Sequence, residues 1–239
     1  MADLAPDTLE LLRHVSVATL CTQLFKRGFR NVFIQGIGRL TQPQGENLVG
    51  PAYTMRNIPA REDLDQISAF DNPDHPQRKG VESIPPGHVL VIDCRGETRV
   101  ASGGQILTTR LMVRGAAGIV SDGPVRDSGA ISEMDYHVYC AGGSAPLNLI
   151  HHHAIDLDVP IGCGGVAVYP GDIIVGDDEG VAVVPRHLAD EVARDAAEQE
   201  KLEGFILERI EKGAALPGTY PPNAKTKADY EAWRRERGV

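Results

Sequence analysis

The sequence has little basic charge, few cysteines and no long hydrophobic run. Its 239 residues carry 24 Lys and Arg against 33 Asp and Glu, a net charge of −9, so nucleic acid is not expected as a partner. The four cysteines form no CxxC pair, which gives no indication of zinc or redox chemistry and favours buried, reduced thiols. No apolar stretch approaches the roughly 20 residues that span a bilayer, and no signal peptide is recognisable. We therefore expect a cytoplasmic protein with no membrane partner.

Hydrophobic residues make up 42% of the chain and charged residues 24%, which is typical of a globular protein. The order of elements indicates the α/β class, because predicted strands alternate with predicted helices. We predict an α/β domain over residues 1–213, and a proline-containing tail with a short helix near Trp233 over residues 214–239. The predicted strands and β-rich segment lie at 89–93, 117–121, 137–140 and 161–184. The predicted helices lie at 7–27, 65–70 (followed by an ordered loop to residue 81), 104–114, 128–134 and 188–212.

The most informative motif is a glycine turn, Gly103-Gly104, followed by Gln105-Ile106-Leu107-Thr108-Thr109. This turn opens a predicted helix, whose first backbone N–H groups are free to bind an anion. One helix and one strand later comes Ser121-Asp122-Gly123-Pro124-Val125-Arg126-Asp127. Its guanidinium can hold a carboxylate through two hydrogen bonds, and its last carboxylate can hold a hard cation. The two segments together predict a site for a small carboxylic acid and a divalent metal.

The segment from Ala101 to Asp127 closely resembles the RraA-like family, which includes the regulators of ribonuclease E activity and the class II 4-hydroxy-4-methyl-2-oxoglutarate aldolases. The resemblance extends from about Ser16 to Pro185. It implies a single layered α/β/α domain of the swivelling-domain-like type. It also implies a homotrimer or a dimer of trimers with active sites between subunits. The function stays open at this point, because enzymes and protein-binding regulators share the fold.

The resemblance implies a role for each matching residue. Arg126 matches the arginine that binds the substrate carboxylate, and its alternative role is a salt bridge at the end of a strand. Asp127 matches the ligand of Mg²⁺ or Mn²⁺, and its alternative role is an N-cap for the helix near Ser128. The backbone N–H groups of Ile106 and Leu107, after the Gly104 turn, match the carboxylate cradle.

Gln105 departs from the aldolase pattern. Aldolases of this family have an aspartate at this position, and an amide cannot accept a proton as a carboxylate does. Gln105 could still form a hydrogen bond with a substrate hydroxyl or with a metal-bound water, so we keep it as a candidate catalytic residue. Asp122, Arg61, Glu62 and a carboxylate of a neighbouring subunit are the alternative candidates for the base.

Three other patterns resemble ligand clusters without their spacing. Adjacent histidines point in different directions, so His151-His152-His153 is expected to be structural or on the surface. The segment Asp177-Asp178-Glu179-Gly180 lacks the spacing of a calcium loop and predicts a β-turn. Acidic residues on the predicted helix over 188–212 indicate a solvated face, although relatives bring a C-terminal carboxylate towards a neighbour's metal; these residues are Glu191, Glu198, Glu200 and Glu203.

The sequence and the resemblance together predict a divalent-metal-dependent lyase that acts on a small 2-oxo acid. The reaction would be retro-aldol cleavage of a 4-hydroxy-2-oxo acid, decarboxylation of oxaloacetate, or both, through a metal-stabilised pyruvate enolate. Two alternatives remain. One is a protein-binding regulator of an RNA-processing enzyme, and the other is a dehydratase or isomerase of 2-keto-3-deoxy sugar acids.

Overall fold

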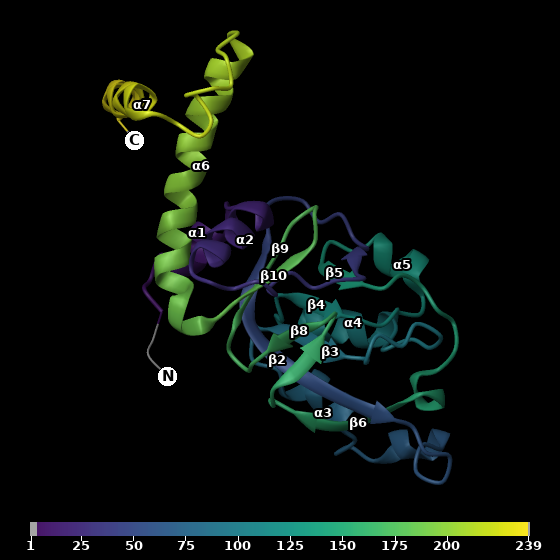
Figure 1. The fold of residues 1–239 in the computed structure, drawn as a ribbon. Helices are drawn as coiled ribbons and strands as arrows, with labels where there is room; N and C mark the ends of the chain where they lie inside the picture. Colours follow the sequence, from purple (N-terminus) through teal and green to yellow (C-terminus); the bar gives the residue numbers. More distant parts are fainter. Residues whose placement is uncertain (1–3, 239) are drawn as a thin grey trace.

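The computed structural model describes residues 4–238, which form a mixed sheet flanked by helices (Figure 1). The α-helices are α1 (Thr8–Arg13), α2 (Val17–Lys26), α3 (Pro76–Ser83), α4 (Gln105–Val113), α5 (Ser128–Ser132), α6 (Ala189–Glu211) and α7 (Ala224–Arg237). The short 3-10 helices are η1 (Ile67–Asp71), η2 (Asn148–Ile150) and η3 (Arg186–Leu188). The strands are β1 (Gly38–Arg39), β2 (Leu48–Pro59), β3 (Val89–Asp93), β4 (Gly118–Ser121), β5 (His137–Cys140), β6 (His152–Leu157), β7 (Ile161–Cys163), β8 (Val166–Val168), β9 (Ile173–Gly176) and β10 (Val181–Val184).

The main sheet has the strand order β1-β5-β4-β3-β2-β9-β10, and β6 also pairs with β2. Strands β2, β3, β4 and β5 are parallel neighbours, with Leu90 opposite both Tyr53 and Ile119. Such strands are buried on both faces, which explains the continuous apolar run of residues 89–92. The loops after β3 and β4 therefore emerge at the same edge of the sheet, where α/β proteins bind ligands.

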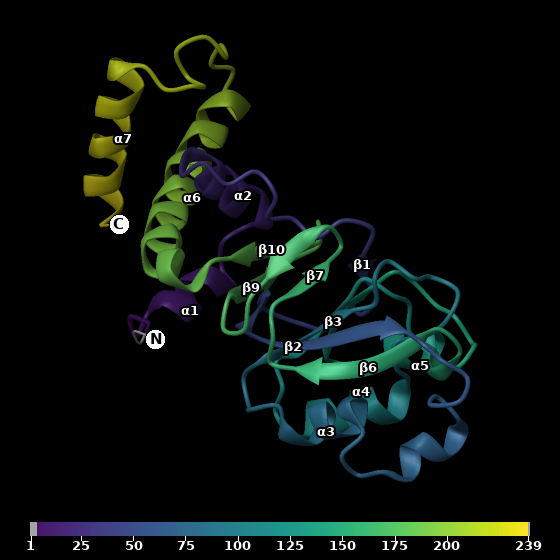
Figure 2. The same ribbon diagram turned by 60° about the horizontal axis from the view of Figure 1, so that its bottom comes forward.

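Three hydrophobic cores divide the fold into layers. Helices α3, α4 and α5 lie on one face of the sheet (Figure 2), and the side chains of Leu90 and Ile92 belong to the core on that face. Val89 and Val91 face the opposite core, which residues of β7, β8, β9 and β10 complete. A third core joins β9 and β10 to α1, α2 and α6. The predicted α/β class and the predicted β-rich segment over 161–184 are confirmed. The sequence pattern did not indicate that β9 and β10 join the main sheet while β7 and β8 form a separate two-stranded sheet.

Three elements correct the sequence prediction. The single helix predicted over 7–27 is wrong, because Ser16 accepts a hydrogen bond from the Thr19 N–H (3.1 Å) and begins a second helix. The ordered loop predicted up to residue 81 is wrong in part, because α3 begins at Pro76. Strand β6 was not predicted, because the histidines at its start do not form a typical strand pattern. The segment nevertheless pairs with the end of β2.

Helix α6 extends beyond the sheet, and α7 lies beside its far half (Figure 1). Phe205 of α6 contacts Tyr230 and Trp233 of α7, with ring centroids 5.5 and 5.6 Å apart. The boundary predicted between residues 213 and 214 stays a prediction. Within residues 4–238, none of the helices combines the length and the apolar character that crossing a membrane requires.

Candidate functional site

Two loops at the carboxyl ends of β3 and β4 meet beside the N-terminus of α4. The Ser102 N–H donates to the Pro124 carbonyl (2.7 Å), and the Arg126 N–H donates to the Gly103 carbonyl (2.9 Å). The buried side-chain amide of Gln77, on α3, donates to the Ser102 carbonyl (2.7 Å). Backbone and side-chain hydrogen bonds thus fix three elements of the chain in one position around the site.

Gly104 is required by the close approach of these two loops. Its φ of −141° and ψ of −175° suit any residue, so backbone conformation does not explain the glycine. A Cβ atom at this position would lie 2.7 Å from both Arg126 Cγ and Asp127 Oδ2. The absence of a side chain at Gly104 therefore allows the arginine and the aspartate to pack against the start of α4.

Asp127 directs its carboxylate towards α4 rather than towards its own helix. It occupies the N-cap position of α5 with a left-handed φ of 59°, but its side chain makes no capping hydrogen bond there. Instead Oδ2 accepts a hydrogen bond from the Gln105 N–H (3.2 Å). The alternative role as a side-chain cap of α5 is therefore wrong. The side chain is 45% exposed, so its other oxygen is accessible to a cation.

The first turn of α4 offers free hydrogen-bond donors. The Thr108 N–H closes the first helical bond, to the Gly104 carbonyl (3.1 Å). Among the described residues, no backbone acceptor outside the helix pairs with the Ile106 or Leu107 N–H. The Ile106 side chain is 84% exposed, whereas Leu107 packs against the core beneath α4. The two amides have the freedom that an anion cradle requires.

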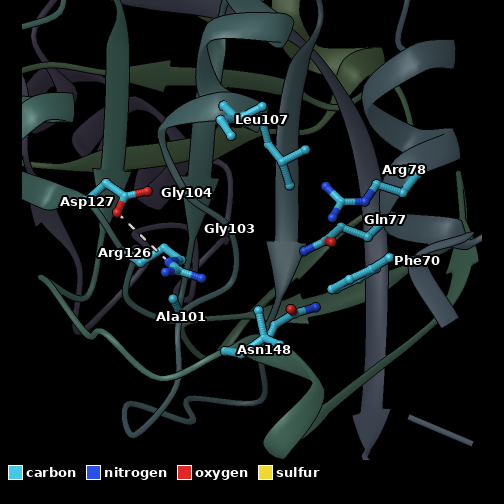
Figure 3. Close-up of a pocket in the computed structure, with 12 residues that line it drawn as sticks. Phe70, Gln77, Arg78, Ala101, Gly103, Gly104, Leu107, Arg126, Asp127 and Asn148 are labelled. Carbon is cyan, nitrogen blue, oxygen red and sulfur yellow. Dashed lines mark ion pairs between the residues drawn. The ribbon is translucent and has the colours of Figure 1, made fainter. Parts of the chain in front are cut away.

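Arg126 and Asp127 line a pocket of about 240 Å³ that opens beside the α4 N-terminus (Figure 3). The nearest ion-pair contact of Arg126 is a loose one, with its Nε 3.9 Å from Asp127 Oδ1, and its side chain is 44% exposed. The alternative role of Arg126 in a strand-end salt bridge is thus weakly supported. Gly104, Ile106 and Leu107 line the same pocket, so the structure brings five of the six predicted site residues together.

The far wall of the pocket consists of residues that the sequence motifs did not indicate. Phe70, Gln77 and Arg78 come from η1 and α3 and lie across from Arg126 in Figure 3. The Arg78 guanidinium lies over the Phe70 ring, 4.2 Å from its centroid. The sequence contained one signal for the start of α3: proline is common at the first position of a helix, and Pro76 occupies that position.

Gln105 is the predicted site residue that does not line the pocket. It is the first residue of α4, and its side chain is exposed. Its backbone N–H is bound to Asp127. The Gln105 side chain is therefore exposed and outside the pocket lining, whereas its backbone N–H lies beside the Asp127 carboxylate.

The other candidates for the base lie outside the pocket. Asp122 is buried, and its carboxylate accepts hydrogen bonds from the N–H groups of Cys94 (2.5 Å), Gly96 (3.0 Å) and Gly164 (3.3 Å). It is a structural residue that joins three loops. Neither Arg61 nor Glu62 lines the pocket, and Arg61 pairs with the neighbouring Asp63 (2.6 Å).

The histidine triplet does not form a cluster of ligands. His152 is buried in β6, and burial lowers its pKa to about 4. The next residue, His153, is hydrogen-bonded through Nδ1 to the buried carboxylate of Asp65 (2.8 Å). These two side chains have different surroundings, as alternation along a strand requires.

The two acidic patterns also have structural roles. Asp177 begins the turn between β9 and β10, and its carboxylate accepts hydrogen bonds from the N–H groups of Glu179 (2.9 Å) and Val17 (2.8 Å). On α6, carboxylates connect the helix to its neighbours. Glu200 accepts from the Ser16 hydroxyl (2.7 Å), and Glu198 pairs with Arg234 of α7 (2.8 Å).

Comparison with known proteins identifies similar sequences and structures. Residues 17–183 match the model of the RraA-like family, described as Aldolase/RraA. A protein of Halalkalibacterium halodurans named "Putative 4-hydroxy-4-methyl-2-oxoglutarate aldolase" is 32% identical over 172 residues, which are 70% of this chain and 76% of the relative.

Two crystal structures resemble the whole fold. The structure of RraAS2 from Streptomyces coelicolor, described as an unusual member of the RNase ES inhibitor RraA family, has a TM-score of 0.74 and 30% identity. The alignment covers 86% of this chain and 98% of RraAS2. An uncharacterised protein of Pseudomonas syringae has a TM-score of 0.77 and 25% identity, covering 92% of this chain and all of that one.

Proposed function

This chain belongs to the RraA-like (Aldolase/RraA) family, and from that premise we propose that it is a divalent-metal-dependent lyase acting on a small 2-oxo acid. One observation carries the proposal. The Arg126 guanidinium, the free amides of Ile106 and Leu107, and the Asp127 carboxylate all border one pocket. These groups suit a 2-oxo acid, because its carboxylate needs an anion site and its adjacent 2-oxo oxygen needs a cation beside that site.

Arg126 and the α4 N-terminus bind the substrate carboxylate in this proposal. The planar guanidinium matches the two carboxylate oxygens through parallel N–H···O bonds. The amides of Ile106 and Leu107 add donors at the positive end of the helix dipole. Backbone hydrogen bonds hold the Arg126 loop and the first turn of α4 together before the substrate arrives, which reduces the reorganisation needed when it binds.

Asp127 is the residue that would hold the cation. Its carboxylate is half exposed, and its nearest cationic partner, Arg126, is 3.9 Å away. A single carboxylate suits Mg²⁺ or Mn²⁺, because Mg²⁺ commonly keeps several water ligands. When bound, the cation supplies Lewis-acid polarisation of the 2-oxo group. The orientation of Asp127 depends on the Gln105 N–H and on the space left by Gly104.

The reaction breaks the C3–C4 bond of the substrate, and its electron pair moves to C3, which then takes a proton. Arg126 offsets the negative charge of the neighbouring carboxylate throughout. In oxaloacetate C4 leaves as CO₂, so no base is needed to break the bond. A 4-hydroxy-2-oxo acid needs a base for its hydroxyl proton. Asp127 is the only carboxylate among the described lining residues, so retro-aldol cleavage would need a base from a neighbouring subunit of the expected trimer.

A panel of 2-oxo acids tests this proposal. Oxaloacetate, 4-hydroxy-4-methyl-2-oxoglutarate and a 2-keto-3-deoxy sugar acid would be incubated with the purified protein, with and without Mg²⁺. We expect saturable pyruvate release from at least one of the first two acids, only with the metal present. Loss of water from the sugar acid without pyruvate release would instead favour a dehydratase.

A second candidate function is a protein-binding regulator of an RNA-processing enzyme. The observation that favours it is the 30% identity to RraAS2 over 98% of that chain. The net charge of −9 would suit a basic partner. Co-purification with a ribonuclease E-type enzyme, together with inhibition of its RNA cleavage, would support this alternative over the lyase.

A further inference from the structure

A cluster of metal-ligating side chains lies at the opposite end of the parallel strands from the pocket. Glu10 belongs to α1, His14 follows the end of α1, and Glu46 precedes β2. One ligand atom from each residue lies within 4.8 Å of the other two. Strand β2 is parallel to β3, so the start of β2 and the carboxyl end of β3 are at opposite edges of the sheet. The cluster is therefore separate from the Asp127 site.

The distances within the cluster fit a tetrahedral metal ion. His14 Nε2 lies 3.2 Å from Glu10 Oε1 and 3.8 Å from Glu46 Oε1. Bonds of about 2.0–2.2 Å to a tetrahedral Zn²⁺ place the ligand atoms about 3.3–3.6 Å apart. The two measured distances lie on either side of this range, so small side-chain movements suffice to bring the three atoms to one ion.

Arg13 orients both carboxylates of the cluster. Its Nη1 donates a hydrogen bond to Glu46 Oε2 (3.3 Å), and its Nε lies 3.6 Å from Glu10 Oε2. Each carboxylate thus directs one oxygen towards Arg13 and the other towards His14. Carboxylates that bind metals commonly have such an outer partner. Two carboxylates and one guanidinium leave one net negative charge, which attracts a cation.

The loop that carries Glu46 is fixed against the end of α1. The backbone N–H of Asn47 donates to the Arg13 carbonyl (3.2 Å). The side-chain amide of Asn47 donates to the Val15 carbonyl (2.8 Å). These bonds place the third ligand beside the first two without help from a metal. The three ligand side chains are exposed, so an ion can reach them from solvent.

The ligand types indicate which ions the cluster would select. An imidazole nitrogen suits Zn²⁺, Cu²⁺ and Ni²⁺, whereas Mg²⁺ and Ca²⁺ prefer oxygen ligands alone. Three protein ligands leave the fourth position of a tetrahedral ion for water. Within residues 4–238, no second group of three His, Cys, Asp or Glu residues converges in this way.

We propose that Glu10, His14 and Glu46 form a binding site for a divalent transition-metal ion such as Zn²⁺, which joins α1 to the loop before β2. Metal binding replaces the proton of His14 that faces the two carboxylates. The site does not depend on the proposed lyase function, because it shares no residue with the pocket.

Calorimetric titration of the full chain with Zn²⁺ tests the proposal, using protein without a histidine tag that has been treated with a chelator and dialysed. The variants are His14→Gln, Glu46→Gln and the matched control His187→Gln, which removes an exposed histidine outside the cluster. We expect the parent to bind Zn²⁺ saturably at the cluster. Loss of a ligand's outer partner alone costs about 10- to 100-fold in affinity, so His14→Gln and Glu46→Gln should each bind at least about 10-fold more weakly. His187→Gln should bind as the parent does.

Two further measurements separate this site from the pocket. Asp127→Asn should keep the Zn²⁺ affinity of the cluster, and a roughly 100-fold excess of Mg²⁺ should not displace Zn²⁺ from it. Zn²⁺ should also raise the midpoint of thermal unfolding more for the parent than for His14→Gln, because an ion that binds the folded chain stabilises it.

The proposal fails if the parent shows no saturable Zn²⁺ binding, or if His14→Gln and Glu46→Gln bind as tightly as the parent. The three residues would then form only a surface ion-pair cluster. An equal loss of affinity in His187→Gln would mean that Zn²⁺ binds exposed histidines without selection. Loss of Zn²⁺ binding in Asp127→Asn alone would assign the ion to the pocket, and it too would overturn the proposal.

Discussion

Replacing Gly104 with alanine should damage the site far more than the stability of the fold. The added Cβ would lie 2.7 Å from Arg126 Cγ and Asp127 Oδ2, whereas ordinary van der Waals contact begins at 3.4 Å. The loop that carries both residues must therefore move by about 0.7 Å or more. Alanine fits the backbone angles of Gly104, so the whole effect should come from this displacement.

Two magnitudes follow from that displacement. Overpacking of this size costs about 1–3 kcal/mol of unfolding free energy. A misplacement approaching 1 Å lowers turnover by about 100-fold. We expect Gly104→Ala to remain folded in thermal and urea unfolding, with kcat/KM for its best 2-oxo acid reduced at least about 50-fold.

Gly129 provides the matched control, because it lies two residues beyond Asp127 and a Cβ there would contact nothing within 4 Å. Gly129→Ala, inside α5, should leave activity unchanged and stabilise the helix by up to about 1 kcal/mol. Normal kinetics in Gly104→Ala would contradict this expectation, since they would mean that the position of Arg126 and Asp127 does not matter for turnover.

Three further predictions concern single side chains. Arg126→Lys should lower kcat/KM by roughly 100-fold and weaken substrate binding, because lysine lacks the planar fork; steady-state kinetics close to the parent's would remove Arg126 from the site. Gln105→Asp should raise Mg²⁺-dependent retro-aldol turnover at least about 10-fold, since general-base assistance contributes roughly 10²–10⁴-fold; an unchanged rate in a folded variant would mean that position 105 does not reach the substrate. Burial lowers the pKa of His137 and of His152 from 6.5 to about 4. Between these values the unfolded chain binds more protons, so stability is complete above pH 6.5 and is lost as the pH falls towards 4, by at most about 3 kcal/mol per histidine. Urea unfolding of His152→Leu should show a weaker acid dependence than the parent, and an identical dependence would exclude His152 as a cause.

The sequence predicted those elements whose structure is determined by their own residues. The apolar run of residues 89–92 and the glycine turn before Gln105 carry their structure in their own residue types, and both predictions are confirmed. The spacing of the motif also predicted that Arg126 and Asp127 lie near the α4 N-terminus, because the parallel neighbouring strands β3 and β4 end at the same edge of the sheet. Whether these residues bind substrate and metal stays a prediction.

The remaining features depend on contacts between distant segments. Gln77 belongs to the site through its bond to Ser102, 25 residues away in sequence. Asp122 was a candidate base, but it accepts hydrogen bonds from two other loops, the one after β3 and the one between β7 and β8, that only the fold brings together with its own. Whether the Gln105 side chain lines the pocket likewise depends on the three-dimensional arrangement of α4 and its turn. No local pattern contains this information.

In the proposed function, the Arg126–Asp127 pocket releases pyruvate from a 2-oxo acid with the help of a divalent cation. The most direct test is pyruvate release from oxaloacetate, measured above the Mg²⁺-catalysed background, for the parent protein and for Asp127→Asn. We expect a saturable rate that EDTA abolishes, that added Mg²⁺ restores, and that Asp127→Asn lacks. A rate that survives EDTA and extensive dialysis, or that Asp127→Asn retains in full, would contradict it.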